Sequence, residues 1–202
     1  MPASVPRPTH RKATAAIACC AAAAACALAA APAIAATSGA QTARAASTCA
    51  DASLMPSSTD LARIAAATLC LINQQRAAAR LPALRSNAAL NTAASQHSLD
   101  MVAKNYFDHT SPSGSTMLSR LTAVGYIKPN KGWSIGENIA AATGSLATPA
   151  AIVTSWMSSP GHRANILSPT FKDTGIGAAA GVPQLVGQGA GGTYTEDFAV
   201  TS

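Results

Sequence analysis

The chain is organised around the stretch from Asn105 to Leu167, which contains three short motifs: Asn105-Tyr-Phe-Asp-His109-Thr-Ser-Pro112, Gly136-Glu137-Asn-Ile-Ala140 and Trp156-Met-Ser-Ser-Pro-Gly-His162-Arg-Ala-Asn-Ile-Leu167. Together they hold two histidines and one of the only two glutamates of the protein. Elsewhere the chain is mostly alanine, serine, threonine and glycine. Because so few reactive side chains occur, their concentration in one stretch indicates a functional site.

The N-terminal residues have the layout of a secretory signal peptide. Three basic residues precede an alanine-rich apolar run from Ala13 to Leu28, and small residues end it at Ala36. This three-part layout is typical of a leader that is removed on export. An anchor helix needs about 20 strongly apolar residues, whereas alanine is barely hydrophobic. We therefore expect a signal peptide at 1–36, a linker and N-terminal extension at 37–58, one domain at 59–202, and a secreted protein without a stable membrane span.

The charge of the chain does not indicate nucleic-acid binding. The formal net charge is +6, but from residue 46 onward ten Lys/Arg face eight Asp/Glu, which leaves +2. No basic stripe with interleaved aromatic residues is present, although nucleic-acid binding proteins usually have one. We expect a monomer that binds no nucleic acid.

Two cysteines remain after the leader, Cys49 and Cys70. An even number of cysteines in an exported chain predicts a disulfide, and closing a loop of this length stabilises the fold by about 3 kcal/mol. The alternative is a buried thiol at Cys70 and an exposed one at Cys49. A lone exposed thiol outside the cell is the less expected arrangement.

Apolar periodicity predicts helices first and strands later along the chain. We expect helices at about 60–80, 87–105 and 116–124, a fourth from Pro149 that Pro160-Gly161 ends, and another turn at 163–167. Short strands are expected at 174–180, 183–187 and 193–201. This order predicts an α+β fold with helices packed on a small antiparallel sheet.

Two polar residues of the second predicted helix lie on different faces. His97 shares a face with Leu90, Ala94 and Met101, so it is predicted at the core, where a lone histidine is more often structural than a ligand. Asp100 lies on another face, four residues before Lys104, which predicts an exposed ion pair.

The motifs resemble those of the CAP superfamily, which is named for cysteine-rich secretory proteins, antigen 5 and pathogenesis-related-1 proteins, and most of all its short bacterial secreted members. Besides the three motifs above, the resemblance rests on Leu71-Ile-Asn-Gln-Gln-Arg76, Ser98-Leu-Asp-Met101 and the spacing from Arg120 to Gly125-Tyr126. It spans about Leu61 to Val200. The resemblance implies an α-β-α sandwich with a central groove.

The resemblance also implies a set of groove residues. In many members two histidines and two acidic residues line the groove, and some bind zinc or another divalent cation there. By motif, the histidines are His109 and His162 and the first acid is Glu137. The second acid falls on Ser159, which carries no charge; Asp108 or Glu196 are candidates to replace it. His97, Ser159, Asn138 and Trp156 are expected as groove or structural residues.

Two interpretations of the site follow. Two imidazoles and a carboxylate suit a divalent metal with an open position. The alternative is a cluster in which His109 and His162 hydrogen-bond to Glu137, and in that case we expect raised histidine pKa values. No serine lies in a Gly-x-Ser-x-Gly elbow, so no catalytic residue is predicted.

We therefore predict a non-catalytic extracellular binding module for a lipid, a peptide or a cell-wall component. The alternative is a metal-assisted hydrolase that acts on extracellular or cell-wall material.

Overall fold

The computed structural model describes residues 48–184 and 186–202. The predicted signal peptide and most of the predicted linker lie outside these residues. The chain divides into the units Met1–Ala43 and Arg44–Ser202, and the described residues all belong to the second. In its described residues, no helix is both long enough and apolar enough to cross a membrane.

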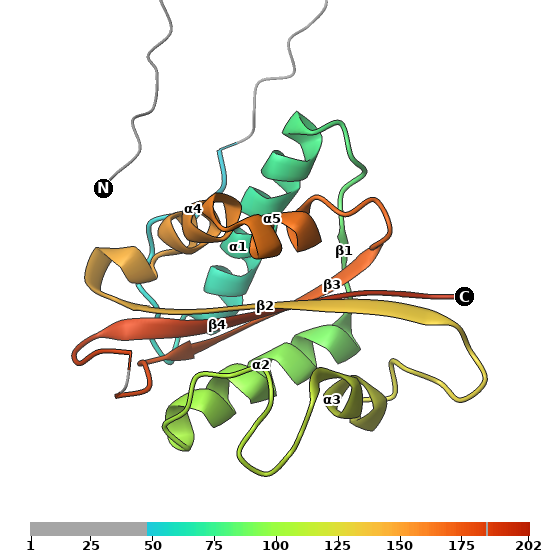
Figure 1. Cartoon of the computed structure of the whole chain (residues 1–202). Helices are drawn as coiled ribbons and strands as arrows, with labels where there is room; N and C mark the ends of the chain where they lie inside the picture. The colour runs from blue at the N-terminus through green and yellow to red at the C-terminus, as the bar shows by residue number, and fades with distance from the viewer. Residues whose placement is uncertain (1–47, 185) are drawn as a thin grey trace, which may run out of the picture. The chain divides into compact units, whose positions relative to one another are not determined.

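Helices cover both faces of a four-stranded sheet (Figure 1). The strand order is β1 (Arg85–Ser86), β3 (Asp173–Ala180), β4 (Gly191–Thr201) and β2 (Trp133–Thr143). One face carries α1 (Leu61–Ala78), α4 (Pro149–Ser158) and α5 (Pro160–Ile166), with the short 3-10 helix η1 (Gly144–Ala147) leading into α4. The other face carries α2 (Ala88–Ala103) and α3 (Met117–Ala123). The α+β class and the α-β-α sandwich are thus confirmed.

The sheet is mixed rather than wholly antiparallel. Strand β4 pairs antiparallel with both β2 and β3, as expected. The two-residue strand β1 pairs parallel with β3, and the helix that follows it, α2, packs on β3 and β4. Neither β1 nor β2 is among the strands expected from the sequence.

One strand expected from the sequence, at 183–187, is wrong. The amide of Val186 donates to the carbonyl of Pro183 at 2.9 Å, which is the bond of a turn. Pro183 has no backbone N–H to give to a ladder, and the next strand begins only at Gly191.

The helix bounds follow local capping chemistry. Asn87 accepts from the amides of Ala89 and Leu90 at the start of α2, and Thr116 and Thr148 cap α3 and α4 in the same way. Proline is tolerated in the first turn of a helix, where the missing N–H has no partner to lose. Pro160 therefore begins α5 instead of only ending α4. This corrects the position of His162, which lies inside a helix rather than after one.

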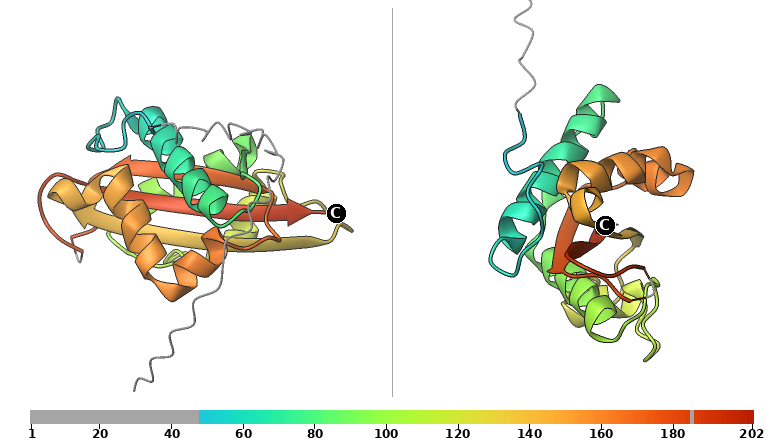
Figure 2. Two further views of the ribbon diagram at one scale, coloured as in Figure 1. Left: turned by 90° about the horizontal axis from the view of Figure 1, so that it is seen from above. Right: turned by 90° about the vertical axis from the view of Figure 1, so that its left-hand side faces the viewer.

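The α2 helix packs unusually close to the sheet. A Cβ atom on Gly175 would lie 2.1 Å from the carbonyl carbon of Leu90, and one on Gly177 would lie 2.1 Å from the amide of Ser95. Only glycine permits this approach. As predicted, the face of α2 that contains His97 and Met101 is buried. Figure 2 shows the helix against the sheet from two further directions.

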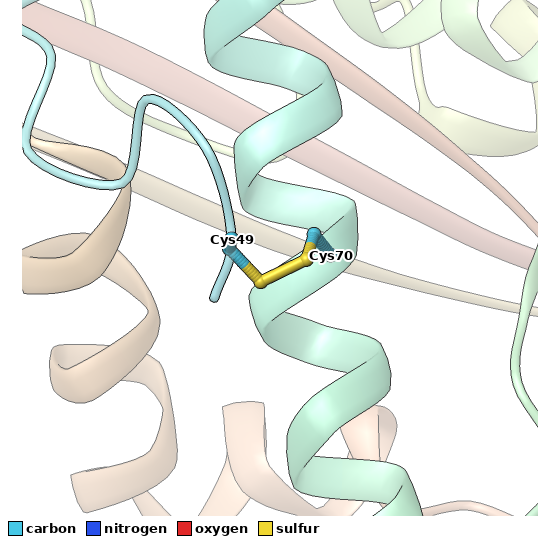
Figure 3. The surroundings of a disulfide bond; sticks show 2 residues. All are labelled: Cys49 and Cys70. Atoms are coloured by element: carbon cyan, nitrogen blue, oxygen red, sulfur yellow. A yellow bond between two sulfur atoms is a disulfide. The ribbon is translucent and has the colours of Figure 1, made fainter. Parts of the chain in front are cut away.

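The predicted disulfide is present. Cys49 and Cys70 are joined with a Cα–Cα distance of 5.8 Å, and the bond ties the segment before α1 to the middle of that helix (Figure 3). This geometry lies in the usual range for disulfides.

Candidate functional site

Glu137 is the centre of the site. It lies on β2, and only 4% of its side chain is exposed. Its Oε1 is 2.7 Å from Nδ1 of His109, and its Oε2 accepts from Nη2 of Arg120 at 2.5 Å. Burial would raise the pKa of this carboxyl, but the bond to His109 and the charge of Arg120 outweigh it and lower the pKa. The carboxylate of Glu137 is therefore buried and is anchored on both oxygens.

The backbone of His109 is held in place by hydrogen bonds, and its side chain is partly exposed. It lies in the loop between α2 and α3, and 55% of its side chain is exposed. Arg120 donates to the carbonyl of His109 at 3.0 Å and to that of Ser115 at 3.1 Å, which holds the loop to α3. The hydrogen bond with Glu137 raises the pKa of His109, as the cluster interpretation predicts. Nε2 of His109 makes no hydrogen bond within the described part of the chain.

His162 comes near His109 but does not join Glu137. It lies in the first turn of α5, and its backbone carbonyl accepts from Nδ2 of Asn138 at 3.2 Å. Its ring makes no hydrogen bond to any described residue. Partial burial and the nearby charge of His109 lower its pKa. The expected bond between His162 and Glu137, and the expected rise in the His162 pKa, are therefore wrong.

His97 lies behind Glu137 on α2 and is 1% exposed. Its Nε2 is 4.0 Å from Oε1 of Glu137, too far for a hydrogen bond. Its Nδ1 is 3.3 Å from the hydroxyl of Tyr106. Burial lowers the pKa of His97, although the charge of Glu137 opposes this. The prediction of His97 as a core residue is confirmed, but the site extends to it.

Two further charged residues adjoin Glu137, and no role was predicted for either. Arg120 is 9% exposed and forms the ion pair described above. Asp197 on β4 is the Cα partner of Glu137 in the antiparallel ladder and is fully buried. The sequence spacing between Arg120 and Gly125-Tyr126, which belongs to a family motif, was a signal for Arg120. The position of Asp197 next to Glu137 follows only from the register of β2 and β4.

Of the two expected replacements for the second acid, Asp108 acts on His109, because the hydrogen bond with Glu137 and the charge of Asp108 both raise the pKa of His109, whereas Glu196 does not face the site. Ser159 is the residue between α4 and α5, and its hydroxyl caps neither helix. Asp108 is exposed and accepts from the amide of Thr110 at 2.8 Å. Glu196 is buried on the opposite face of the sheet from Glu137, since side chains alternate along β4, and it accepts from Thr174 there.

Trp156 and Asn165 cover the outer edge of β2 next to Glu137. The indole of Trp156 donates to the carbonyl of Ile139 at 3.2 Å. The amide of Asn165 donates to the carbonyl of Glu137 at 3.3 Å and to Oδ1 of Asn138 at 2.9 Å. An open strand edge has unpaired backbone groups, so these side chains satisfy it and fix Glu137. Trp156 and Asn138 are structural residues of the site.

A three-ligand metal centre made of His109, His162 and Glu137 does not fit this arrangement. Both Glu137 oxygens are engaged, one of them by a guanidinium cation. Across residues 48–184 and 186–202, no group of three or more His, Cys, Asp or Glu lies together so as to hold a metal ion. Among the described residues of the site, ring nitrogens without a hydrogen bond remain on His109, on His162 and on the buried His97, whose Nε2 has no partner. Metal binding stays a prediction from the sequence.

The fold and this cluster define a known class of protein. The model of the cysteine-rich secretory protein family, CAP, matches residues 69–184. This chain belongs to that family.

Individual relatives agree with this assignment. The uncharacterized protein YkwD of Bacillus subtilis is 37% identical over 107 residues, which are 53% of this chain and 39% of that protein. A crystal structure described as an extracellular protein containing a SCP domain, from Bacillus anthracis, is 28% identical with a TM-score of 0.55, over 71% of this chain and 43% of that one. This chain thus spans less than half the length of both relatives.

An outer surface protein of Borrelia burgdorferi shares the fold alone. It is 16% identical with a TM-score of 0.51, over 66% of this chain and 90% of that one.

Proposed function

We propose that this protein is an extracellular, non-catalytic binding module whose ligand contacts His109 and His162. The observation that carries the proposal is the way His109 is held. Its Nδ1 is bonded to a buried carboxylate, while more than half of its side chain is exposed. A carboxylate behind a histidine fixes the orientation of the ring and strengthens the other nitrogen as a partner for a ligand.

The engagement of Glu137 disfavours a hydrolase. A general base or nucleophile needs a carboxylate or hydroxyl that can reach the substrate. Both oxygens of Glu137 are bonded within the protein, and its side chain is 4% exposed. Ser98 bonds to Gly177 and Thr195, and Ser111 pairs with Ser113, so neither hydroxyl is activated by a histidine.

The extracellular location is supported by the signal-like leader, by the name of the family and by the relative described as extracellular. The ligand classes consistent with such a surface are a lipid headgroup, a peptide and a cell-wall fragment. Each of them offers hydroxyl, carboxylate or phosphate groups that can pair with an imidazole.

The test is a chemical-shift titration of the ¹⁵N-labelled domain with three probes: zinc chloride, anionic phospholipid vesicles and a peptidoglycan digest. At least one probe should perturb the signals of His109 and His162. A variant with both residues changed to alanine should lose the response, whereas Thr92→Ala on an exposed part of α2 should keep it. Unchanged histidine signals with all three probes contradict the proposal. Turnover of the digest that a chelator abolishes favours the hydrolase instead.

A further inference from the structure

We infer that His97 is a positioning residue of this site, held by Tyr106 and Asp100 so that it leaves Oε1 of Glu137 to His109. The functional meaning of this role rests on the proposed function, whereas the experiment that tests the role uses no ligand. It assigns a role to a third histidine, which sequence patterns place simply in the core.

The supporting contacts form one chain of hydrogen bonds behind Glu137. Lys104 pairs with Asp100 at 2.6 Å. The hydroxyl of Tyr106 donates to Oδ2 of Asp100 at 2.7 Å and lies 3.3 Å from Nδ1 of His97. His97 and Tyr106 are both buried. These hydrogen bonds therefore connect an exposed ion pair to His97, which lies next to Glu137.

The direction of each hydrogen bond in this chain is set by chemistry. An ionised aspartate only accepts hydrogen bonds, and Lys104 keeps Asp100 ionised. Tyr106 must therefore give its single proton to Asp100. Its oxygen can then only accept from His97, so Nδ1 of His97 carries the hydrogen. In an uncharged, buried imidazole the other nitrogen, Nε2, then carries none.

This tautomer decides which histidine binds Glu137. Oε1 of Glu137 lies 2.7 Å from Nδ1 of His109 and 4.0 Å from Nε2 of His97. A bare Nε2 cannot donate to the carboxylate and repels it. If Nε2 carried the hydrogen, His97 would compete for the same oxygen and would weaken the hold on His109. The direction of the Tyr106 hydrogen bond therefore affects His109 through His97 and Glu137.

The experiment observes the ring nitrogens of the unliganded protein by long-range ¹H–¹⁵N NMR. In the wild type, both His97 and His109 should show a protonated Nδ1. Tyr106→Phe removes the acceptor, so His97 should move to the Nε2–H tautomer and His109 should lose its Nδ1–H signal. Asp100→Asn should have the same effect. Its amide can donate to Tyr106, so the Tyr106 hydroxyl can donate to Nδ1 of His97 instead.

Tyr126→Phe is the matched control. It removes a tyrosine hydroxyl that likewise bonds to an aspartate, Asp173 at 3.0 Å, but Tyr126 has no hydrogen bond to Glu137 or to either histidine. It should leave both histidine signals unchanged. An Nε2–H tautomer of His97 in the wild type overturns the inference. So does a His109 signal that stays the same while His97 changes tautomer. Because no ligand is used, failure here is distinct from failure of the proposed binding function.

Discussion

Glu137 and Asp197 face each other as Cα partners on β2 and β4, both buried, yet only Glu137 has hydrogen-bond partners. Neither carboxyl oxygen of Asp197 is hydrogen-bonded within the described residues. Burial and the charge of Glu137 raise the pKa of Asp197, whereas the pKa of Glu137 is lowered. The pKa values of two carboxyls on neighbouring strands are therefore shifted in opposite directions, and the surroundings favour the negative charge on Glu137 over Asp197.

Glu137→Gln should destabilise the fold strongly at neutral pH. It leaves the guanidinium of Arg120 buried without a counter-charge, which costs about 3–5 kcal/mol. Urea unfolding at pH 7 measures this loss. Asp197→Asn is the control, since burial raises the pKa of Asp197 and favours the uncharged carboxyl that a neutral amide resembles, and it should change stability by less than about 1 kcal/mol. Equal losses in the two variants contradict this assignment of the charge.

The same variant gives a pH dependence. The pKa of Glu137 is lower in the folded than in the unfolded state. Its stabilisation is therefore present above the unfolded pKa and is lost as pH falls through the folded pKa. The difference in melting temperature between wild type and Glu137→Gln should shrink in strongly acidic buffer. A difference that grows on acidification has the wrong sign.

Glu196→Gln should stabilise the protein increasingly as pH rises. Glu196 is completely buried, and burial raises its pKa well above the ordinary value. Such a group contributes its full stability below the unfolded pKa and loses it as pH rises through the folded pKa. Glutamine does not ionise, so the variant avoids this loss. Melting curves from acidic to alkaline pH should diverge in favour of the variant, and parallel curves contradict the expectation.

Gly177→Ala should push α2 away from the sheet. Its Cβ would lie within 2.1–2.4 Å of three backbone atoms of Ala94 and Ser95, and backbone cannot rotate aside as a side chain can. We expect a loss of about 3 kcal/mol. Gly161→Ala in α5 is the matched control, because no atom lies within 4 Å of its Cβ. Since alanine favours helix over glycine by about 1 kcal/mol, the control should be neutral or stabilising.

Loss of the disulfide should lower stability without changing the site. Cys49 and Cys70 are 21 positions apart, and opening a loop of this size costs about 3 kcal/mol. The double variant Cys49→Ala/Cys70→Ala should show this in chemical unfolding. Its histidine NMR signals at the site should match the wild type, because both cysteines lie on the α1 side and Glu137 faces α2. Shifted signals at His109 contradict this separation.

Much of the fold could be predicted because its signals are local. The apolar period of α1 and α2 depends on residues a few positions apart, so the sequence predicts both helices. The failures came where local signals conflict. Pro160 is compatible with either the end or the start of a helix, and Pro183 begins a turn where the sequence predicts a strand.

The sequence by itself determined the family motifs and the disulfide, since each depends on residue type and spacing along the chain. Only the tertiary structure decided which residues lie next to Glu137. His109, Arg120, His97 and Asp197 come from a loop, two helices and a neighbouring strand, so their distances depend on strand register and on the close packing of α2. Spacing along the chain carries no information about such contacts, because they are fixed by the packing of elements distant in sequence.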